Sequence, residues 1–296
     1  MKVAGMHIIT DSYARFLQPT QLIDAPLTIL PNRFQVDGLW QREHAGQPVV
    51  ALLKRMKEAQ SPPQLHPPSS EDYAQLFTRL GMEHETILSI HASAEVSPTL
   101  AHAREAARVL HGHCHIELFD SQNISVMQGM LVEAAIAACR GQTDIADLVP
   151  ALRGMTHRIY SVFLVEDLSS LQRNGYLSLA HQILSEMHDL RVVVSMEGGA
   201  LHLIEKARTR AAGIERLVEF VLEFEELECG YILQAQPGHT ETTRILRERL
   251  AQERPGAQFG QLIYGASLAA HIGTEATGIA LLEREPNGAE LGMGGA

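Results

Sequence analysis

The sequence predicts an α/β fold of two domains, and three observations lead to this prediction. Short apolar runs alternate with helical stretches through the first half of the chain, a pattern typical of a mainly parallel sheet flanked by helices. The chain has 296 residues, enough for two domains with a core each. Its composition, 45% hydrophobic and 20% charged, is that of a soluble globular protein. We expect domains at residues 1–157 and 158–284, followed by a flexible tail at 285–296.

The first half supplies the alternation. Strands are expected at the apolar runs 3–9, 26–31, 86–90 and 115–119. Helices are expected at 48–60, 71–80, 98–108, 127–140 and 145–157. We place Ser70 and Ser97 as N-caps of the second and third of these helices, and a kink or restart at Pro150. Residues 61–70 hold too many prolines for a helix or a central strand, so a semi-rigid loop is expected.

The second half contains further strands and helices. Strands are expected at 160–165, 191–196, 201–205, 230–235, 261–264 and 278–282. Helices are expected at 168–171, 208–224 and 240–252. Gly198 and Gly199 lie between two of the strands, which indicates a β-hairpin. Residues 265–273 are expected to connect the last two strand regions.

Hydroxyl groups follow several of the predicted strands. Thr10 and Ser12 follow the first strand, Ser93 and Ser97 follow the third, and Ser121 follows the fourth. Ligands in open α/β sheets bind beyond the carboxyl ends of the strands, where helix N-termini also favour anions. These side chains are therefore candidates for a carboxylate or phosphate site. Ordinary capped turns between strand and helix remain the alternative interpretation.

Charge and composition exclude several classes of function. The formal net charge of −11 argues against nucleic acid as the main partner, because phosphate binding needs a basic patch. No apolar run is long enough to span a membrane, and the N-terminus does not have the form of a signal peptide. The three cysteines are far apart and odd in number, so no disulfide framework is expected. A cytoplasmic protein without stable membrane insertion follows.

One segment of the chain has the composition of a metal site. The segment His111-Gly112-His113-Cys114-His115 holds imidazole and thiol ligands suited to zinc or nickel. A structural zinc site needs four ligands and no second cluster is evident, so a polar connection is the favoured interpretation. The chain has neither a Gly-x-Ser-x-Gly elbow nor a nucleotide-binding glycine motif, which argues against a hydrolase or a nucleotide-using catalyst.

Several short motifs in order along the chain carry a family resemblance. They are Thr10-Asp11-Ser12, the proline-rich stretch 65–69, Ser93–Thr99, Asp120-Ser121, Leu171–Gly175, Glu205–Arg210 and Ala270–Gly273. With these motifs the chain resembles the DegV family of bacterial fatty-acid-binding proteins over nearly its whole length. The resemblance implies two α/β domains with a long-chain fatty acid, such as palmitate, stearate or oleate, in a buried tunnel between them. It also implies no cofactor and no metal.

The resemblance further implies a carrier rather than an enzyme. In some members of the family a separate fatty-acid kinase phosphorylates the bound carboxylate, as a step toward phospholipid metabolism. Arg173 and Arg208 match the basic positions proposed to face that kinase, whereas Tyr176 stands where the family has an arginine. We expect a monomer. The alternative is a small-anion-binding enzyme or sensor with the same fold and a remodelled pocket.

The resemblance also suggests which residues hold the carboxylate. Ser97 and His271 match the family's serine and histidine, and Ser93 lies near them in the motif. Leu65 stands at the position of the family's carboxylate-binding threonine and has no donor, so His66 is a hypothetical replacement. Each buried methylene contributes roughly 0.8 kcal/mol, so the acyl chain would dominate affinity and the head group would set orientation.

Overall fold

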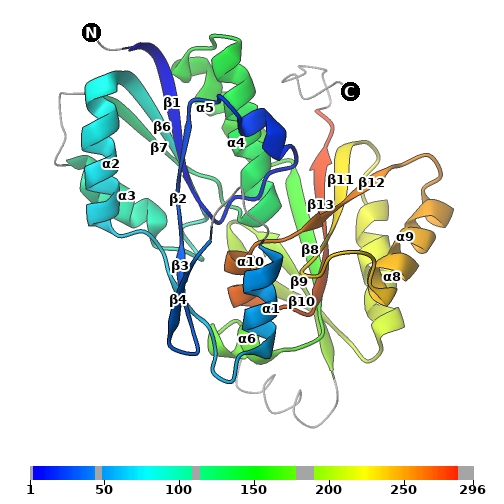
Figure 1. Cartoon of the computed structure of the whole chain (residues 1–296). Helices are drawn as coiled ribbons and strands as arrows, with labels where there is room; N and C mark the ends of the chain where they lie inside the picture. Colours follow the sequence, from blue (N-terminus) through cyan, green and yellow to red (C-terminus); the bar gives the residue numbers. More distant parts are fainter. Residues whose placement is uncertain (1–2, 44–48, 109–113, 178–189, 286–296) are drawn as a thin grey trace.

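The computed structural model describes residues 3–43, 49–108, 114–177 and 190–285. Helices and sheets alternate across the molecule in layers, in the order helix, sheet, helix, sheet, helix (Figure 1). We call the half built on the first sheet the first lobe, and the half built on the second sheet the second lobe. The predicted mixed α/β fold, with a parallel sheet flanked by helices and a second sheet domain, is confirmed.

The sheet of the first lobe has the strand order β2-β1-β6-β7, and all its pairings are parallel. Its strands are β1 (Val3–Asp11), β2 (Leu27–Leu30), β6 (His84–His91) and β7 (His115–Asp120). Helices α2 (Ser70–Glu83) and α3 (Thr99–Arg108) cover its outer face through a cluster that includes Tyr73, Phe77 and Ile87. The parallel order brings the carboxyl ends of β1, β6 and β7 to one edge, where the polar turns meet.

The sheet of the second lobe has the order β10-β9-β8-β13-β11-β12 and is antiparallel except for the pair β11–β12. Its strands are β8 (Ile159–Val165), β9 (Arg191–Glu197), β10 (Ala200–Ala207), β11 (Leu227–Gln234), β12 (Phe259–Ile263) and β13 (Ala276–Glu283). The predicted hairpin is the pair β9–β10. Helices α8 (Arg210–Leu222) and α9 (Glu241–Glu253) cover the outer face around Leu217, Ile232 and Leu246.

Helix α4 (Ser125–Arg140) lies between the two sheets and is buried along nearly its whole length. It contacts β1 and β6 on one side and β8 on the other, so one continuous core joins the lobes. Helix α5 (Ile145–Thr156) packs beside it and keeps Pro150 within the helix, so the expected restart does not occur. The boundary expected at residue 157 stays a prediction, and the strands of the two sheets fall on either side of it.

A small sheet of order β4-β3-β5 completes the first half. Its strands are β3 (Arg33–Val36), β4 (Leu39–Arg42) and β5 (Gln64–His66). The other short elements are η1 (Pro19–Leu22), α1 (Val50–Glu58), α6 (Ser169–Arg173) and α10 (Ala266–Ile272). The proline-rich stretch thus contains an edge strand, a position where the missing N–H groups are tolerated. Helix α10 occupies the segment that was expected to be a connection.

Some boundaries differ from the sequence prediction for reasons of capping. Ser69, not Ser70, caps α2, because its side chain accepts from the N–H of Asp72 while Asp72 accepts from Ser69 in return. Thr209 caps α8, so Arg208 lies before the helix instead of within it. Ser97 does accept from the backbone N–H of Thr99 at the start of α3, as expected of a cap.

Within the described part of the chain, no helix is long and apolar enough to cross a membrane. The same residues contain no group of three or more His, Cys, Asp or Glu side chains placed to hold a metal ion. Residues 109–113 of the histidine-rich segment and residues 286–296 of the predicted tail lie outside the described residues. Cys114 donates from Sγ to the carbonyl oxygen of Glu85 at 3.2 Å, which ties it to the start of β6.

Candidate functional site

A pocket of about 590 Å³ lies between the two lobes. The first lobe contributes Tyr13, residues 61–65, Pro67, Val96 and Pro98. The second lobe contributes residues at the end of α6 and in α10. Its volume falls in the range of about 300–1,000 Å³ that is typical of small-molecule sites. Because Tyr13 follows β1 and Val96 follows β6, the pocket lies beyond the carboxyl ends of these strands, where ligands of parallel sheets bind.

The side walls of the pocket are mainly apolar. Pro63, Leu65 and Val96 line it. The proline-rich segment is held at its start by Asp37, which accepts hydrogen bonds from the backbone N–H groups of Gln60 at 3.3 Å and Ser61 at 3.1 Å. This tether comes from the β3–β4 turn, so the small sheet fixes one wall. Such walls suit an apolar ligand body.

His271, on the wall of the pocket, is the centre of a group of hydrogen-bonded polar side chains. Its Nε2 lies 3.3 Å from the hydroxyl of Tyr13, and its Nδ1 lies 2.9 Å from the hydroxyl of Tyr176. Burial lowers the pKa of His271 to about 4, so the imidazole is neutral at pH 7. One ring nitrogen of a neutral imidazole donates and the other accepts, so the two tyrosines have opposite roles in these bonds.

Tyr13 connects this histidine to Ser97. The tyrosine is 1% exposed, and Ser97 forms a hydrogen bond with its hydroxyl. Burial raises the pKa of Tyr13 strongly, the hydrogen bond from Ser97 offsets part of this, and the nearby Asp11 raises it further. Ser97 in turn lies 3.3 Å from the Thr99 hydroxyl. The result is a chain of neutral hydroxyl and imidazole groups that reaches the pocket wall at Tyr13 and His271.

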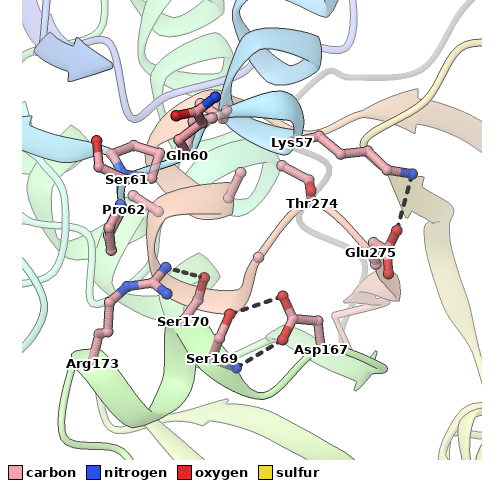
Figure 2. A pocket seen from close by; sticks show the side chains of 16 residues that line it. Lys57, Gln60, Ser61, Pro62, Asp167, Ser169, Ser170, Arg173, Thr274 and Glu275 are labelled. Carbon is pink, nitrogen blue, oxygen red and sulfur yellow. Dashed lines mark hydrogen bonds and ion pairs between the residues drawn. The ribbon is translucent and has the colours of Figure 1, made fainter. Parts of the chain in front are cut away.

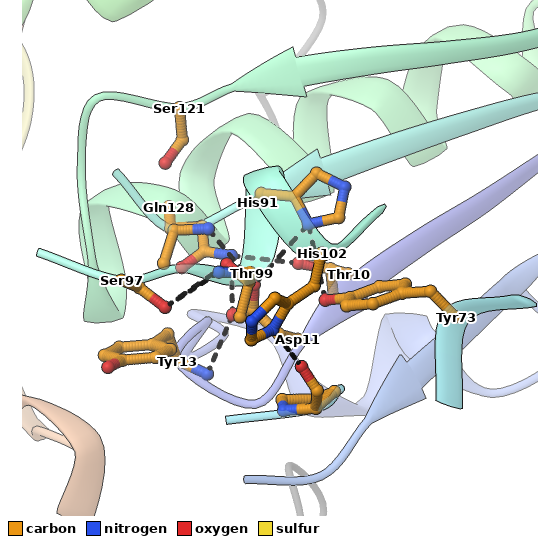
Figure 3. A network of polar contacts seen from close by, with 12 residues as sticks. Thr10, Asp11, Tyr13, Tyr73, His91, Ser97, Thr99, His102, Ser121 and Gln128 are labelled. Atoms are coloured by element: carbon orange, nitrogen blue, oxygen red, sulfur yellow. Dashed lines mark hydrogen bonds and ion pairs between the residues drawn. The ribbon is translucent and has the colours of Figure 1, made fainter. Parts of the chain in front are cut away.

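Below this chain, Asp11 is the centre of a buried polar network (Figure 3). Its carboxylate accepts from the backbone N–H groups of Tyr13 at 3.2 Å and Ala92 at 3.1 Å, and from the side-chain amide of Gln128 at 3.1 Å. Burial raises the pKa of Asp11, and these bonds favour the charged form and lower it in part. Because the donors come from β1, the end of β6 and α4, the network fixes the turn that carries Tyr13.

Helix α10, which carries His271, is anchored to the first lobe at its other end. Glu43 accepts a hydrogen bond from the backbone N–H of Ala266 at 2.7 Å and another from the hydroxyl of Ser267. Asn32 donates to that same hydroxyl at 2.7 Å. Burial raises the pKa of Glu43 to about 7, and the bonds to Ser267 and the charge of Arg15 lower it in part. These contacts position the helix across the interface between the lobes.

The structure brings some of the predicted site residues together and separates others. Leu65 and His271 line the pocket, and Ser97 lies directly behind Tyr13. The hydroxyls of the other four candidates bond to the protein outside the pocket: Thr10 accepts from Gln128, Ser12 from the N–H of Asn32, Ser93 donates to the carbonyl of Gly199, and Ser121 donates to the carbonyl of Asn123. Their geometry is that of structural hydrogen bonds.

His66 also lies away from the pocket. Side chains alternate along β5, so His66 points to the opposite face from Leu65, and its ring lies 4.8 Å from that of Trp40. Tyr13 lines the same pocket as Leu65 and carries a hydroxyl. Neither Tyr13 nor Tyr176 was selected from the sequence, although Tyr13 directly follows the Thr10-Asp11-Ser12 motif.

A second, more polar pocket of about 370 Å³ adjoins the first (Figure 2). The two share Ser61, Pro62, Pro63, Arg173 and Ala270 on their walls. Arg173 is exposed and donates to the hydroxyl of Ser170 at 2.8 Å. Lys57 and Glu275 form an ion pair at 2.9 Å across the far side. The predicted basic residue Arg208 is also exposed, after β10, and lines neither pocket.

Comparisons with known proteins agree on one family. The sequence model of the DegV family, described as uncharacterised protein, matches residues 5–284. A DegV domain-containing protein of Listeria innocua is 24% identical over 276 residues, which is 92% of this chain and 96% of that protein. Protein DegV of Bacillus subtilis is 28% identical over 228 residues, 75% of this chain and 79% of its own.

Solved structures show the same fold. A fatty-acid-binding DegV family protein from Streptococcus agalactiae superposes with a TM-score of 0.83 at 20% identity. The superposition covers 96% of this chain and 100% of that protein. The fatty acid kinase B3 protein from Streptococcus pneumoniae, loaded with linoleic acid, superposes with a TM-score of 0.76 at 18% identity, covering 95% and 100% of the two chains.

Proposed function

The chain belongs to the DegV family, and on that premise we propose that it binds a long-chain fatty acid such as palmitate, stearate or oleate in the pocket between its lobes. The head group lies against Tyr13, Ser97 and His271, and the acyl chain extends along the apolar walls. One observation carries this proposal: a pocket between the lobes whose wall combines apolar side chains with the hydrogen-bonded pair Tyr13 and His271. The names of two structural relatives, which state bound fatty acid, support it.

The two parts of the ligand have different energetic roles. Each methylene removed from water contributes roughly 0.8 kcal/mol, so a long chain supplies most of the affinity. A buried head group must be hydrogen-bonded, because an unsatisfied polar group costs roughly 1–3 kcal/mol. The hydroxyls of Tyr13 and Ser97 meet this need at one end only. They therefore fix the direction in which the ligand lies.

We further propose that the protein is a carrier that presents the lipid to a separate fatty-acid kinase and does not itself catalyse acyl-phosphate formation. Arg173 at the rim of the pocket and Arg208 on the surface are the proposed docking residues, since both are exposed cations. A relative named as a fatty acid kinase B3 protein supports this assignment. In this proposal the carrier is a cytoplasmic monomer without a cofactor.

Blocking the pocket tests the binding proposal. Val96→Trp places a large ring on the pocket wall, and we expect it to weaken binding of radiolabelled palmitate by at least about tenfold, since the ring displaces several methylenes. Ala101→Trp, at an exposed position of α3, is the matched control. Equal palmitate affinity in both variants and the parent protein would contradict the assignment of this pocket.

A further inference from the structure

The head-group end of the pocket offers hydrogen bonds but no charge in contact with them. Tyr13 from the turn after β1 and His271 from α10 line it, and behind them Ser97 from the start of α3 bonds to Tyr13 and Tyr176 after α6 bonds to His271. All four are neutral at pH 7, since burial lowers the pKa of His271 to about 4 and raises that of Tyr176 to about 12. Both nitrogens of His271 already bond to the tyrosines.

Arg173 is the one cation among the described residues that line this pocket. It is exposed, and its guanidinium donates to Ser170 on the wall of the adjoining pocket. Figure 2 shows it turned toward that serine. A solvated arginine engaged in this way gives little compensation to a charge buried beside Tyr13.

Two acidic groups, Asp11 and Glu43, lie behind this part of the pocket, and the cation Arg15 lies beside Glu43 and offsets part of its charge. Asp11 and Glu43 both act on Tyr13 electrostatically, and both favour its neutral form. A carboxylate placed against Tyr13 would meet the same unfavourable field. Leu65 adds an apolar side chain to the wall, which offers a bound ion neither a hydrogen bond nor an opposite charge. Burying an ion without a partner costs far more than burying a neutral polar group.

We propose that this site binds the head group in its uncharged form, so that a fatty acid is held as the carboxylic acid. This inference rests on the proposed function and adds to it the protonation state and class of head group. The carboxylate in water takes up one proton from solvent on binding, and no other bond forms or breaks. The bound acid then has one O–H donor and one carbonyl acceptor, which hydroxyl and imidazole partners satisfy equally well.

A protonated His271 facing a carboxylate would also consume one proton, so pH dependence alone does not separate the two arrangements. Head groups of fixed charge do. We would measure binding of palmitate, hexadecan-1-ol and hexadecyl sulfate to the delipidated protein, in competition with radiolabelled palmitate, at pH 6, 7, 8 and 9.

Binding of the acid form predicts three results. The Kd of palmitate rises about tenfold per pH unit, because one proton is taken up. The Kd of hexadecan-1-ol is independent of pH. Hexadecyl sulfate binds at least about thirtyfold more weakly than the alcohol at every pH, since its charge has no partner.

Other results would overturn the inference. If hexadecyl sulfate bound as tightly as hexadecan-1-ol, the site would accept an anion, through His271 or Arg173. If Arg173→Gln weakened palmitate binding more than alcohol binding, Arg173 would be the partner of a bound carboxylate. Binding of none of the three compounds would instead refute the proposed function itself, and this inference with it.

Discussion

At the scale of residues, the site is a chain of neutral groups supported from below by a buried acid. Hydrogen bonds connect Tyr176 to His271, His271 to Tyr13, and Tyr13 to Ser97. Asp11 accepts from the backbone N–H of Tyr13 and so fixes its position. Each group is desolvated, so its hydrogen bonds are strong and a lost partner is costly. In the proposed function, this arrangement supplies the hydrogen bonds of the head group although Leu65 provides no donor.

Removal of the Tyr13 hydroxyl tests this account. We expect Tyr13→Phe to weaken binding of palmitate at pH 6 by about fivefold to tenfold, the effect of one hydrogen bond. Tyr73→Phe is the matched control, because it removes a buried hydroxyl that lies 3.4 Å from His91 and outside the pocket. Titration of both variants by fluorescence-detected or radiolabelled binding decides the matter. An equal loss in the two variants would show that the effect is structural.

We expect the buried Glu43 to make the stability of the protein depend on pH. Its pKa is about 7 in the folded protein against 4.5 in the unfolded chain, so the folded state retains a proton that the unfolded state releases. The contribution of Glu43 to the free energy of unfolding therefore falls by roughly 3 kcal/mol in total as the pH rises from about 4.5 to 7. Denaturant unfolding at pH 5 and pH 8 measures it.

Glu43→Gln removes this component while the amide keeps a hydrogen bond to the start of α10. The variant should gain stability relative to the parent protein at pH 8 and not at pH 5. A parallel pH profile for the two proteins would show that Glu43 is ionised throughout, paired with Arg15.

At the scale of elements, α4 joins the lobes, and a glycine permits its close approach to the segment that follows β1. A Cβ at Gly129 would lie 1.9 Å from the carbonyl oxygen of Arg15. We expect Gly129→Ala to lower the free energy of unfolding by roughly 3 kcal/mol, because backbone on both sides must move. Thermal and denaturant unfolding measure this loss.

Gly154→Ala in α5 is the matched control, since a Cβ there meets nothing within 4 Å. It should raise stability by about 0.5–1 kcal/mol through helix propensity. Destabilisation of both variants to the same degree would contradict the steric explanation.

Local pattern explains which elements were predictable. The strands β1, β6 and β7 are apolar runs between polar turns, and the sequence predicts each of them within a few residues. Strand β3 alternates polar and apolar residues over only four positions, and β4 does not alternate, so neither stands out in the sequence as a strand. Helix α10 has seven residues between Gly265 and Gly273, too short for a helical period to show.

The site was less predictable than the fold, for a physical reason. His271 and Tyr13 are 258 positions apart in the chain, and their contact depends on how the lobes pack. Ser93 was selected for its hydroxyl, yet that group donates to Gly199 of the second lobe at 2.6 Å. A sequence motif identifies a turn with polar groups. Only the packing decides which of them face the ligand.

At the scale of the whole molecule, the pocket lies at the interface between the lobes, and of the two proposed docking residues Arg173 lies on its wall and Arg208 lies outside it. We expect Arg208→Glu to slow phosphorylation of the bound lipid by a fatty-acid kinase about tenfold or more, because it reverses charge at the docking surface. Arg244→Glu, on the outer helix α9, is the control. Equal rates for both variants would remove Arg208 from the proposed docking surface.

The central claim is that the native protein carries a long-chain fatty acid. Denaturing the purified protein, extracting it with organic solvent and analysing the extract by mass spectrometry tests this directly. The account predicts a near-stoichiometric long-chain fatty acid. An extract without lipid, followed by no uptake of added palmitate or oleate, would contradict it.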